Sequence, residues 1–235
     1  MRPRLVLTDI EGTTTPISFV HQALFPYGRA ALPSLIRDRA DEPEVAEALA
    51  AIARAAPGAD PLEQCLAWMN EDAKVTPLKQ LQGIAWREGY RSGALQSELY
   101  GDVPPALRAW QAAGVRLAVY SSGSEAAQRL IFAHAAQGDL TGLFDAFLDT
   151  RIGGKREAAS YTRAAGALGL PPADILFLSD MAAELDAAAA GGLRTCQLLR
   201  AGDFTEPSPA HLQAPDFPAV ARLFGLPTLA APARA

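Results

Sequence analysis

The sequence predicts a doubly wound parallel α/β sheet with one all-helical insertion. Residues 1–16 and 100–235 alternate short β-favouring apolar runs with helical segments, a pattern that indicates βαβ units and a parallel sheet. In residues 17–99 the apolar side chains recur at spacings of three and four, and no strand pattern interrupts them. We therefore expect a core domain formed by residues 1–16 and 100–235 and a helical domain formed by residues 17–99.

Composition is that of an ordinary globular protein. The chain has 235 residues, of which 49% are hydrophobic and 20% charged, so it contains enough apolar material for a core. A formal net charge of -5 argues against non-specific binding to nucleic acid. Cys65 and Cys196 lie far apart and lack metal-site spacing, so we expect buried thiols in a reducing compartment. With three histidines in the chain, we expect no zinc cluster.

The sequence also predicts where the protein resides and in what form. Arg2 and Arg4 lead directly into the first strand, without the apolar core of a signal peptide. No uncharged apolar run approaches the ~18 residues needed to span a bilayer. We expect a soluble cytoplasmic protein with no membrane partner. No coiled-coil pattern or exposed apolar helix stands out, which favours a monomer.

The first element, within residues 5–16, is an apolar strand that ends in two acids. Asp9 and Glu11 stand at the point where the strand stops, and Gly12 then allows a sharp turn. Residues two apart on a strand share a face, but a chain that turns after Asp9 no longer follows that rule, so the turn decides whether both carboxylates reach one site. A strand that simply ends in a polar turn is the alternative interpretation.

The insertion is expected to be helical from about residue 18 to residue 99. Prolines mark the starts of three of its helices, at Pro43, Pro61 and Pro77. The pair Pro57-Gly58 ends the first of these. The third has one apolar face, formed by Leu78, Leu81, Ile84 and Ala85. These residues predict a compact helical domain.

Helices and strands then alternate from Asp102 to about residue 200. Strands are expected at 115–120, 144–148, 175–178 and 195–199, which makes five with the first. Helices are expected at 104–110, 125–133, 157–168, 182–190 and 217–224. Gly114 and Gly169 follow two of them as C-terminal glycines. Residues 226–235 are expected to form a frayed tail.

Polar side chains follow several of the expected strands. In parallel α/β sheets, ligands bind beyond the carboxyl ends of the strands. We therefore expect the residues that follow the strands to lie together at one edge of the sheet. They are Asp9 and Glu11, Ser121 and Ser122, Asp180, and residues on the loop after the third strand. Carboxylates and hydroxyls with a lysine nearby suit a divalent cation and a phosphate group.

Each of these groups also has a purely structural interpretation. Ser121 or Ser122 would be the N-cap of the next helix, and Lys155 would be a solvated surface lysine. Asp180 and Glu184, four residues apart at a helix start, would be an N-cap and a first-turn acid, although the same spacing also places both on one face toward a metal. The coincidence of all these groups at successive strand ends favours a phosphoryl-transfer site.

These motifs resemble the haloacid dehalogenase-like hydrolase superfamily. Its pattern is Asp-x-Asp-Gly-Thr, then Ser or Thr after the second strand, then Lys, then paired acids. The matching residues here are Asp9 to Thr13, Ser121 or Ser122, Lys155, and Asp180 with Glu184. The resemblance implies a haloacid dehalogenase-like Rossmannoid core with an inserted all-helical cap. Glu11 departs from the pattern, since most phosphatases of the superfamily have Asp there.

That departure makes the chain similar to the enolase-phosphatases of methionine salvage, also called acireductone synthases. The similarity rests on residues 9–17, 24–27, 78–83, 120–124 and 177–180, and it runs from about residue 5 to residue 199. It implies that a small phosphorylated diketone, 2,3-diketo-5-methylthiopentyl-1-phosphate, is enolised and then dephosphorylated. The expected products are the acireductone 1,2-dihydroxy-3-keto-5-methylthiopentene and phosphate, formed through an aspartyl phosphate.

The resemblance also implies roles for single residues. Asp9 is the expected nucleophile, Glu11 the proton carrier and Lys155 a further catalytic residue. Ser121, Ser122 and Lys155 are expected to bind the phosphate. The cofactor is expected to be Mg²⁺, held by the carboxylates of Asp9, Asp180 and Glu184 and by the backbone carbonyl of Glu11.

The helical domain is expected to act as a lid over the site. Lys79 and Gln82, together with Gln80, are the polar candidates for substrate binding, and Trp86 is a candidate apolar wall. The alternative interpretation is that these polar side chains are solvated and that Trp86 belongs to the core of the helical domain.

Three other functions remain open at this point. The first is a phosphatase of the same fold that acts on another small phosphomonoester. A dehalogenase is less favoured, because its chemistry does not need the acid pair Asp180 and Glu184. A catalytically idle binding module is also less favoured, because Asp9, Glu11 and Lys155 are all present.

Overall fold

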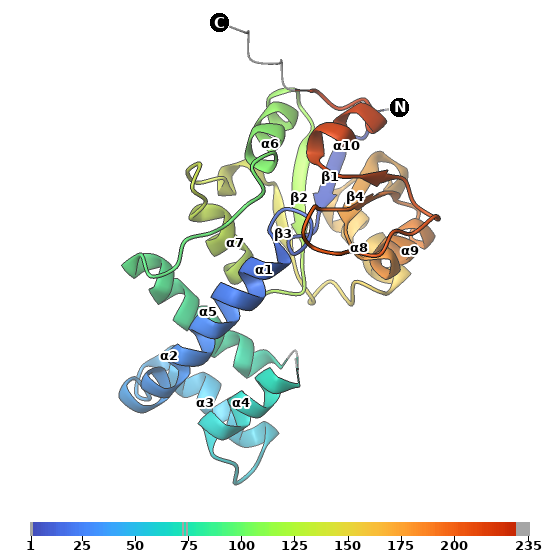
Figure 1. The fold of residues 1–235 in the computed structure, drawn as a ribbon. Coiled ribbons are helices and arrows are strands. Elements are labelled where there is room, and N and C mark those ends of the chain that lie inside the picture. Colours follow the sequence, from blue (N-terminus) through green and yellow to red (C-terminus); the bar gives the residue numbers. More distant parts are fainter. Residues whose placement is uncertain (1, 72, 74, 229–235) are drawn as a thin grey trace, which may run out of the picture. The chain divides into compact units, whose positions relative to one another are not determined.

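The structure, a computed structural model, describes residues 2–71, 73 and 75–228. It divides into two compact units (Figure 1). The core unit comprises Met1–Ser18 and Ser97–Ala235, and the helical unit comprises Phe19–Gln96. The sequence prediction puts the same two divisions after residue 16 and after residue 99.

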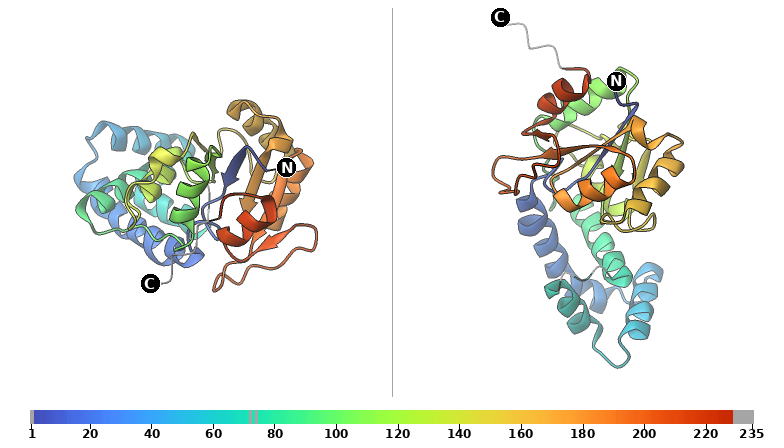
Figure 2. Two further views of the ribbon diagram at one scale, coloured as in Figure 1. Left: turned by 90° about the horizontal axis from the view of Figure 1, so that it is seen from above. Right: turned by 90° about the vertical axis from the view of Figure 1, so that its right-hand side faces the viewer.

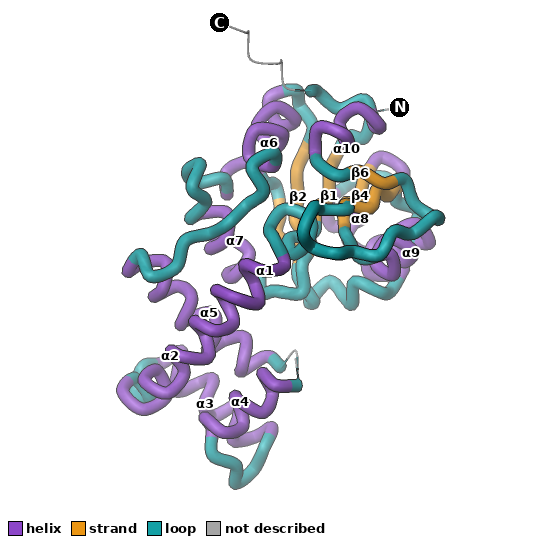
Figure 3. The backbone as a smooth tube through the Cα atoms, in the orientation of Figure 1, coloured by secondary structure: helices purple, strands orange, loops and turns teal. Residues whose placement is uncertain are grey.

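A parallel sheet organises the core unit, and the described residues give it six strands in the order β3-β2-β1-β4-β5-β6 (Figure 3). The strands are β1 (Leu5–Thr8), β2 (Arg116–Tyr120), β3 (Ala146–Leu148), β4 (Ile175–Ser179), β5 (Arg194–Leu198) and β6 (Gln213–Ala214). The central strand β1 pairs with β2 on one side and with β4 on the other. Both β1 and β4 are buried along their whole length, as strands covered on two faces must be. The predicted doubly wound parallel sheet is confirmed.

Helices cover both faces of this sheet (Figure 2). Tyr161 of α8 (Ala158–Leu168) and Leu185 of α9 (Ala182–Ala190) pack into one apolar cluster with Leu148 of β3. The next residue back along β3, Phe147, points the other way and contacts Phe132 of α7 (Glu125–Ala133), with ring centroids 6.1 Å apart. Successive side chains of a strand point to opposite faces of the sheet, so the helices that pack against them form two layers.

Two helices and two short turns complete the described core unit. Helix α6 (Val103–Ala112) packs beside α10 (Phe217–Phe224) through the stacked rings of Trp110 and Phe217, whose centroids are 5.1 Å apart. Short 3₁₀ turns, η2 (Thr141–Leu143) and η3 (Pro172–Asp174), precede β3 and β4. Their positions bring the chain to the amino ends of those strands.

The helical unit contains only helices and loops in its described residues (Figure 3). Helix α1 (Ile17–Phe19), the π-helical turn η1 (Val20–Leu24) and α2 (Phe25–Asp38) follow one another without a break. Helices α3 (Pro43–Ala55), α4 (Pro61–Asn70) and α5 (Thr76–Ser92) begin at or next to the prolines that predict them. The Asp60 carboxylate caps α4 by accepting from the amides of Leu62 and Glu63, each at 2.9 Å.

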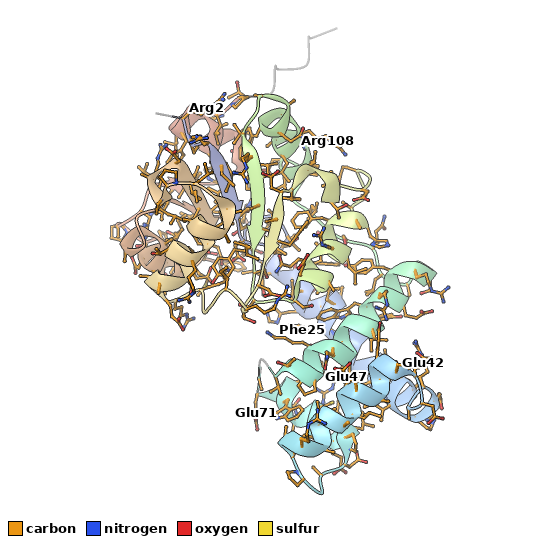
Figure 4. The ribbon with its side chains drawn as sticks, turned by 180° about the vertical axis from the view of Figure 1, so that it is seen from behind. Arg2, Phe25, Glu42, Glu47, Glu71 and Arg108 are labelled. Carbon is orange, nitrogen blue, oxygen red and sulfur yellow. The ribbon has the colours of Figure 1, made fainter. Side chains whose placement is uncertain are left out.

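The predicted apolar face of α5 forms the interior of this unit. Leu78, Leu81, Ile84 and Ala85 are buried in one cluster with residues of α2, α3 and α4. Acidic side chains such as Glu42 and Glu47 are exposed on the outside (Figure 4). The helical periodicity of the sequence therefore identifies the packed face correctly.

Two predictions about the core unit are wrong. The prediction of five strands omits β6, whose two residues carry no periodic signal and are recognised only by their parallel pairing with β5. The frayed tail does not begin at Leu226, because that side chain is buried and the carbonyl of Pro227 accepts a hydrogen bond from the Trp110 indole at 3.1 Å. Residues 229–235 of the expected tail lie outside the described residues.

Both cysteine thiols are buried and unbridged, as the sequence predicts. Burial raises the pKa of Cys65 to about 11 and that of Cys196 to about 12, so both remain protonated at neutral pH. Of the helices in the described part of the chain, none combines the length and apolar character needed to cross a bilayer.

Candidate active site

The candidate site lies at the carboxyl edge of the sheet, around the end of β1. The amide of Asp9 donates to the carbonyl of Leu178 at 2.9 Å, so Asp9 continues the ladder between β1 and β4. The amide of Ser121 donates to the carbonyl of Leu148 at 3.1 Å in the same manner at the end of β2. Asp180 directly follows β4. Parallel strands therefore bring these residues, predicted one by one, to a common edge.

A tight turn follows Asp9. The amides of Thr13, Thr14 and Thr15 all donate to the carbonyl of Ile10, at 3.2, 2.8 and 2.9 Å. Gly12 has a φ of 66°, and a Cβ atom there would lie 2.6 Å from Oδ2 of Asp180. Gly12 is thus required both for the left-handed backbone and for the close approach of the Asp180 carboxylate. The turn brings the backbone next to Glu11 against Asp180.

Lys155 lies in the interior of the site. Its Nζ is 2.7 Å from Oδ1 of Asp9 and 2.6 Å from Oε2 of Glu184, and its side chain is 6% exposed. The hydroxyl of Tyr161 donates to the Lys155 carbonyl at 2.8 Å, and that of Tyr120 donates to the Gly153 carbonyl at 2.9 Å, which holds the loop. The interpretation of Lys155 as a solvated surface lysine is wrong, because its side chain is buried between two carboxylates. The tertiary fold alone brings those carboxylates to it.

The site contains more carboxyl groups than positively charged groups. Burial, together with the nearby charges of Asp9 and Glu184, raises the pKa of Asp180 to about 7. Burial and the charge of Asp9 also raise the pKa of Glu184, against the opposing effect of Lys155. Burial alone would lower the pKa of Lys155, but Asp9 and Glu184 outweigh it and raise that pKa, so the ammonium stays charged. Three carboxyl groups thus share one ammonium.

This imbalance predicts how stability depends on pH in the metal-free protein. A raised pKa means that folded Asp180 binds a proton that the unfolded chain has already lost, so the free energy of unfolding falls as pH rises from about 4 to about 7. We expect the loss between pH 5 and pH 8 to be a few kcal/mol larger in the parent protein than in Asp180→Asn. Urea unfolding in a chelator measures it, and parallel pH profiles of the two proteins would contradict the assignment.

The structure resolves the N-cap alternatives at both helix starts. The cap of α7 is Ser124, whose Oγ accepts from the Ala127 amide at 3.3 Å, so neither Ser121 nor Ser122 has that role. The Oγ of Ser121 instead accepts from the Gly123 amide at 3.2 Å. The N-cap interpretation is therefore wrong for both serines that precede Ser124.

The interpretation of Asp180 as an N-cap is also wrong. The N-cap residue of α9 is Met181, and Asp180 precedes it. Glu184 does lie in the first turn of α9, as predicted, and its Oε2 accepts from the Ser179 hydroxyl at 2.9 Å. Glu184 is therefore held by Ser179 and Lys155 together.

The predicted cap-side residues all lie on α5 of the helical unit. Gln82 is buried, and a Cβ atom at Gly28 would be 3.8 Å from its Cγ, so the alternative interpretation of a solvated side chain is wrong for Gln82. The Trp86 indole donates to the Leu24 carbonyl at 2.8 Å, which gives it a packing role within the unit. Contact of Lys79, Gln80, Gln82 or Trp86 with a substrate stays a prediction.

Two buried polar side chains of the site are not identified by the sequence reasoning. Asp149 directly follows β3 and accepts from the amides of Glu125 and Arg151, at 3.2 and 2.9 Å. Gln197 of β5 donates to the carbonyl of Asp180 at 2.8 Å. The sequence did contain a signal for each of them. Asp149 is an acid directly after a strand, and Gln197 is an amide inside an apolar strand.

The donors at the sheet edge have the chemistry of a magnesium site. The described residues contain no group of three or more His, Cys, Asp or Glu side chains arranged around one point. The carboxylates of Asp9 and Asp180, with the turn at Gly12 packed against Asp180, nevertheless offer the hard oxygen donors that Mg²⁺ prefers. A divalent cation would also relieve the crowding of negative charge that raises the pKa of Asp180. The residues present fit such an ion.

Known proteins with similar sequences match this chain over nearly its whole length. The Enolase-phosphatase E1 of Gluconacetobacter diazotrophicus is 59% identical over 225 residues and covers 96% of each chain. The protein of the same name from Granulibacter bethesdensis is 56% identical over 226 residues, which cover 96% of this chain and 98% of the relative. The family of haloacid dehalogenase-like hydrolases matches residues 3–192.

Solved structures agree with this assignment. The UTR4 protein of Saccharomyces cerevisiae is 33% identical, with a TM-score of 0.76, and the match covers 91% of this chain and 98% of that one. CbbY of Rhodobacter sphaeroides shares the fold, with a TM-score of 0.62 at 19% identity over 92% of this chain and 95% of that one. The chain therefore belongs to the haloacid dehalogenase-like hydrolases and, within them, to the enolase-phosphatase family.

Proposed function

We propose that this protein is a bifunctional enolase-phosphatase of methionine salvage. In this proposal it converts 2,3-diketo-5-methylthiopentyl-1-phosphate to the acireductone 1,2-dihydroxy-3-keto-5-methylthiopentene and phosphate. The observation that carries the proposal is Glu11. It stands two residues after Asp9, on the turn that packs against Asp180, in a chain 59% identical to a protein named for both activities. A phosphatase alone does not need the longer acid at this position.

Enolisation is the first step and is assigned to Glu11. The Glu11 carboxylate removes a proton from C1 of the substrate, next to the C2 carbonyl. The electron pair of that C–H bond becomes the C1–C2 double bond, and the electrons of the C2 carbonyl double bond move to its oxygen, which takes up a proton from water to give the enol. The protonated Glu11 is then ready to give its proton to the oxygen that leaves phosphorus.

Phosphoryl transfer is assigned to Asp9. Because Lys155 holds Oδ1 of Asp9 at 2.7 Å, we assign the attack on phosphorus to Oδ2. The bond between phosphorus and the C1 oxygen breaks as the bond to Oδ2 forms, and water then hydrolyses the aspartyl phosphate to release phosphate. Ser121, Ser122 and Lys155 are the proposed donors to the phosphate oxygens.

The proposed cofactor is Mg²⁺. The carboxylates of Asp9 and Asp180 and the backbone carbonyl of Glu11 would hold it, and it would neutralise charge on the phosphoryl group in the transition state. Glu184 was predicted as a further ligand of the metal. Its bonds to Lys155 and Ser179 favour a different role, in which it keeps the ammonium of Lys155 beside Asp9.

Glu11→Asp tests the dual role. The shorter side chain moves the carboxylate by one methylene away from C1, so we expect proton removal to fall about 10- to 100-fold. Phosphate release from p-nitrophenyl phosphate, which needs no enolisation, is expected to fall by much less. Exchange of the C1 proton with deuterated water and phosphate release are measured on the same preparations. Equal losses in both assays would show that the length of the Glu11 side chain has no special role in proton removal.

A phosphatase for another small phosphomonoester is the second candidate. It rests on Asp9, Lys155 and Asp180, which would serve any such substrate. Comparison of kcat/KM for the diketone phosphate and for phosphomonoesters that cannot enolise separates the two functions. A preference for the latter, without C1 proton exchange, favours the second candidate.

The remaining expectations are part of the same proposal. They are that residues 17–99 act as a cap, that Lys79 and Gln82 bind the substrate, and that the protein is a cytoplasmic monomer. Lys79→Ala and Gln82→Ala would raise KM for the diketone phosphate more than for p-nitrophenyl phosphate if the substrate-binding role is correct.

A further inference from the structure

Arg200 is a buried charged residue that the proposed reaction does not use. It lies two residues beyond β5 and is 5% exposed. Its Nε and Nη2 both donate to the Thr13 carbonyl, at 3.0 and 2.7 Å. Its Nη1 donates to both carboxylate oxygens of Asp102, each at 2.9 Å, and weakly to the Pro215 carbonyl at 3.4 Å. A planar guanidinium is suited to such a two-sided grip, which a lysine cannot reproduce.

Arg200 is held firmly in its own position. Its guanidinium carbon lies 4.2 Å from the ring centroid of Tyr100 and 5.2 Å from that of Phe217. The Asp102 carboxylate that pairs with Arg200 also accepts from the Phe217 amide at 2.8 Å. The Thr13 carbonyl is therefore bound to a rigid partner.

The same group of side chains binds the neighbouring segments of chain. The Tyr100 hydroxyl donates to Asp203, whose other carboxylate oxygen accepts from the Ile17 amide at 3.3 Å. The Tyr100 amide donates to the Thr14 carbonyl at 3.1 Å. Burial and the hydrogen bond to Asp203 raise the pKa of Tyr100, so its hydroxyl keeps the proton that it donates. Tyr100, Asp102, Arg200 and Asp203, here called the arginine cluster, thus tie the turn after Asp9 to the loop after β5.

Asp9 and Glu11 depend on this cluster to different degrees. Asp9 is held by the sheet, through its amide bond to Leu178, and by Lys155. Glu11 lies beyond the sheet, on a turn whose other hydrogen bonds are largely internal. Two consecutive carbonyls of that turn, those of Thr13 and Thr14, are held from outside by Arg200 and Tyr100. A change at Arg200 therefore moves Glu11 more than Asp9.

We propose that Arg200 is a positioning residue for Glu11, which places the Glu11 carboxylate for proton removal and touches neither the substrate nor Asp9. The proposal rests on the function proposed above. In it, proton removal depends on the bond between Arg200 and Thr13 much more than the attack of Asp9 on phosphorus does. A shift of about 1 Å between two reacting groups can reduce the rate by about 10²-fold. We expect a loss of up to this size in the rate of proton removal when Glu11 is displaced.

Arg200→Lys is the test, and Arg116→Lys is its matched control. Arg116 also joins a carboxylate and a carbonyl, since Nε is 2.5 Å from Asp145 and Nη1 is 2.9 Å from the Leu168 carbonyl, but it lies at the amino end of β2. We expect Arg200→Lys to slow C1 proton exchange at least about 10-fold while release of phosphate from p-nitrophenyl phosphate changes less than about 3-fold. Arg116→Lys should change neither rate.

A double variant shows whether Arg200 acts through Glu11. In a Glu11→Gln background, Arg200→Lys should cause no further loss of proton exchange, because the group that it positions is gone. If Arg200→Lys does not fold, as judged by thermal unfolding, Asp102→Asn tests the same link, since it keeps an oxygen for Phe217 and removes the charge that holds Arg200. It should give the same unequal loss, on a smaller scale.

The outcomes separate this proposal from the proposed function. Equal losses of proton exchange and phosphate release, or additive losses in the double variant, overturn the role of Arg200 and leave the enolase-phosphatase function intact. Absence of C1 proton exchange in the parent protein overturns the proposed function, and with it the role of Arg200. An unequal and non-additive loss supports both.

Discussion

Asp9→Asn is expected to lower the rate of phosphate release by at least about 10³-fold. The amide is a poor nucleophile, and it removes the charge that pairs with Lys155 at 2.7 Å. The shape of the side chain is unchanged, and one of three crowded carboxyl groups is lost, so the protein should still fold. Mg²⁺-dependent phosphate release from p-nitrophenyl phosphate measures the effect, and mass spectrometry should detect phosphorylated Asp9 only in the parent protein.

The control for this variant is Asp174→Asn. Asp174 lies at the opposite edge of the sheet and forms an exposed ion pair with Arg4 at 3.3 Å. Such pairs contribute about 0–1 kcal/mol, so the rate should stay within about 2-fold of the parent. Undiminished release by Asp9→Asn, or release that does not depend on metal, would contradict the proposed mechanism.

Lys155→Met is expected to lower the stability of the protein as well as its activity. Methionine has a similar length but leaves the carboxylates of Asp9 and Glu184 buried without a counter-charge. Removal of one partner from a buried ion pair destabilises proteins by about 3–5 kcal/mol. Because unpaired carboxylates gain protons more easily in the folded state, the loss should be larger at pH 8 than at pH 6. Urea unfolding at both pH values measures it.

The second substitution Glu184→Gln is the control for Lys155→Met. It removes one of the two unpaired charges and leaves an amide in place of the carboxylate that accepts from Ser179. The double variant should therefore recover part of the lost stability, most clearly at pH 8. A free energy of unfolding for Lys155→Met within about 0.5 kcal/mol of the parent would show that the pair carries no net stability.

Much of the fold follows from patterns that are local in the sequence. Leu5 to Thr8 is a strand because a short β-favouring apolar run ends in polar turn residues, and the prolines of the insertion mark helix starts because their fixed φ suits the first turn. These signals need only neighbouring residues. β6 lacks such a signal, since two residues have no period, and only its pairing with β5 makes it a strand.

The candidate site is divided in the same way. Asp9, Ser121 and Asp180 were predictable, because each directly follows a strand and parallel strands end at one edge of the sheet. The burial of Gln82 was not, because a glutamine on a helix is solvated unless another helix covers it. Arg200 was missed for the same reason, since its partner Thr13 lies 187 residues away in the chain.

Local sequence patterns predict the parallel sheet, the helical insertion, and the sheet edge that carries Asp9. Periodicity, capping residues and the rule for strand ends are properties of short segments, so they can be read before the chain folds. Three features follow from the folded arrangement alone: Lys155 is buried between Asp9 and Glu184, Gly12 brings the turn against Asp180, and Arg200 holds that turn. Burial and charge depend on distances between segments far apart in the chain, and these distances exist only after folding.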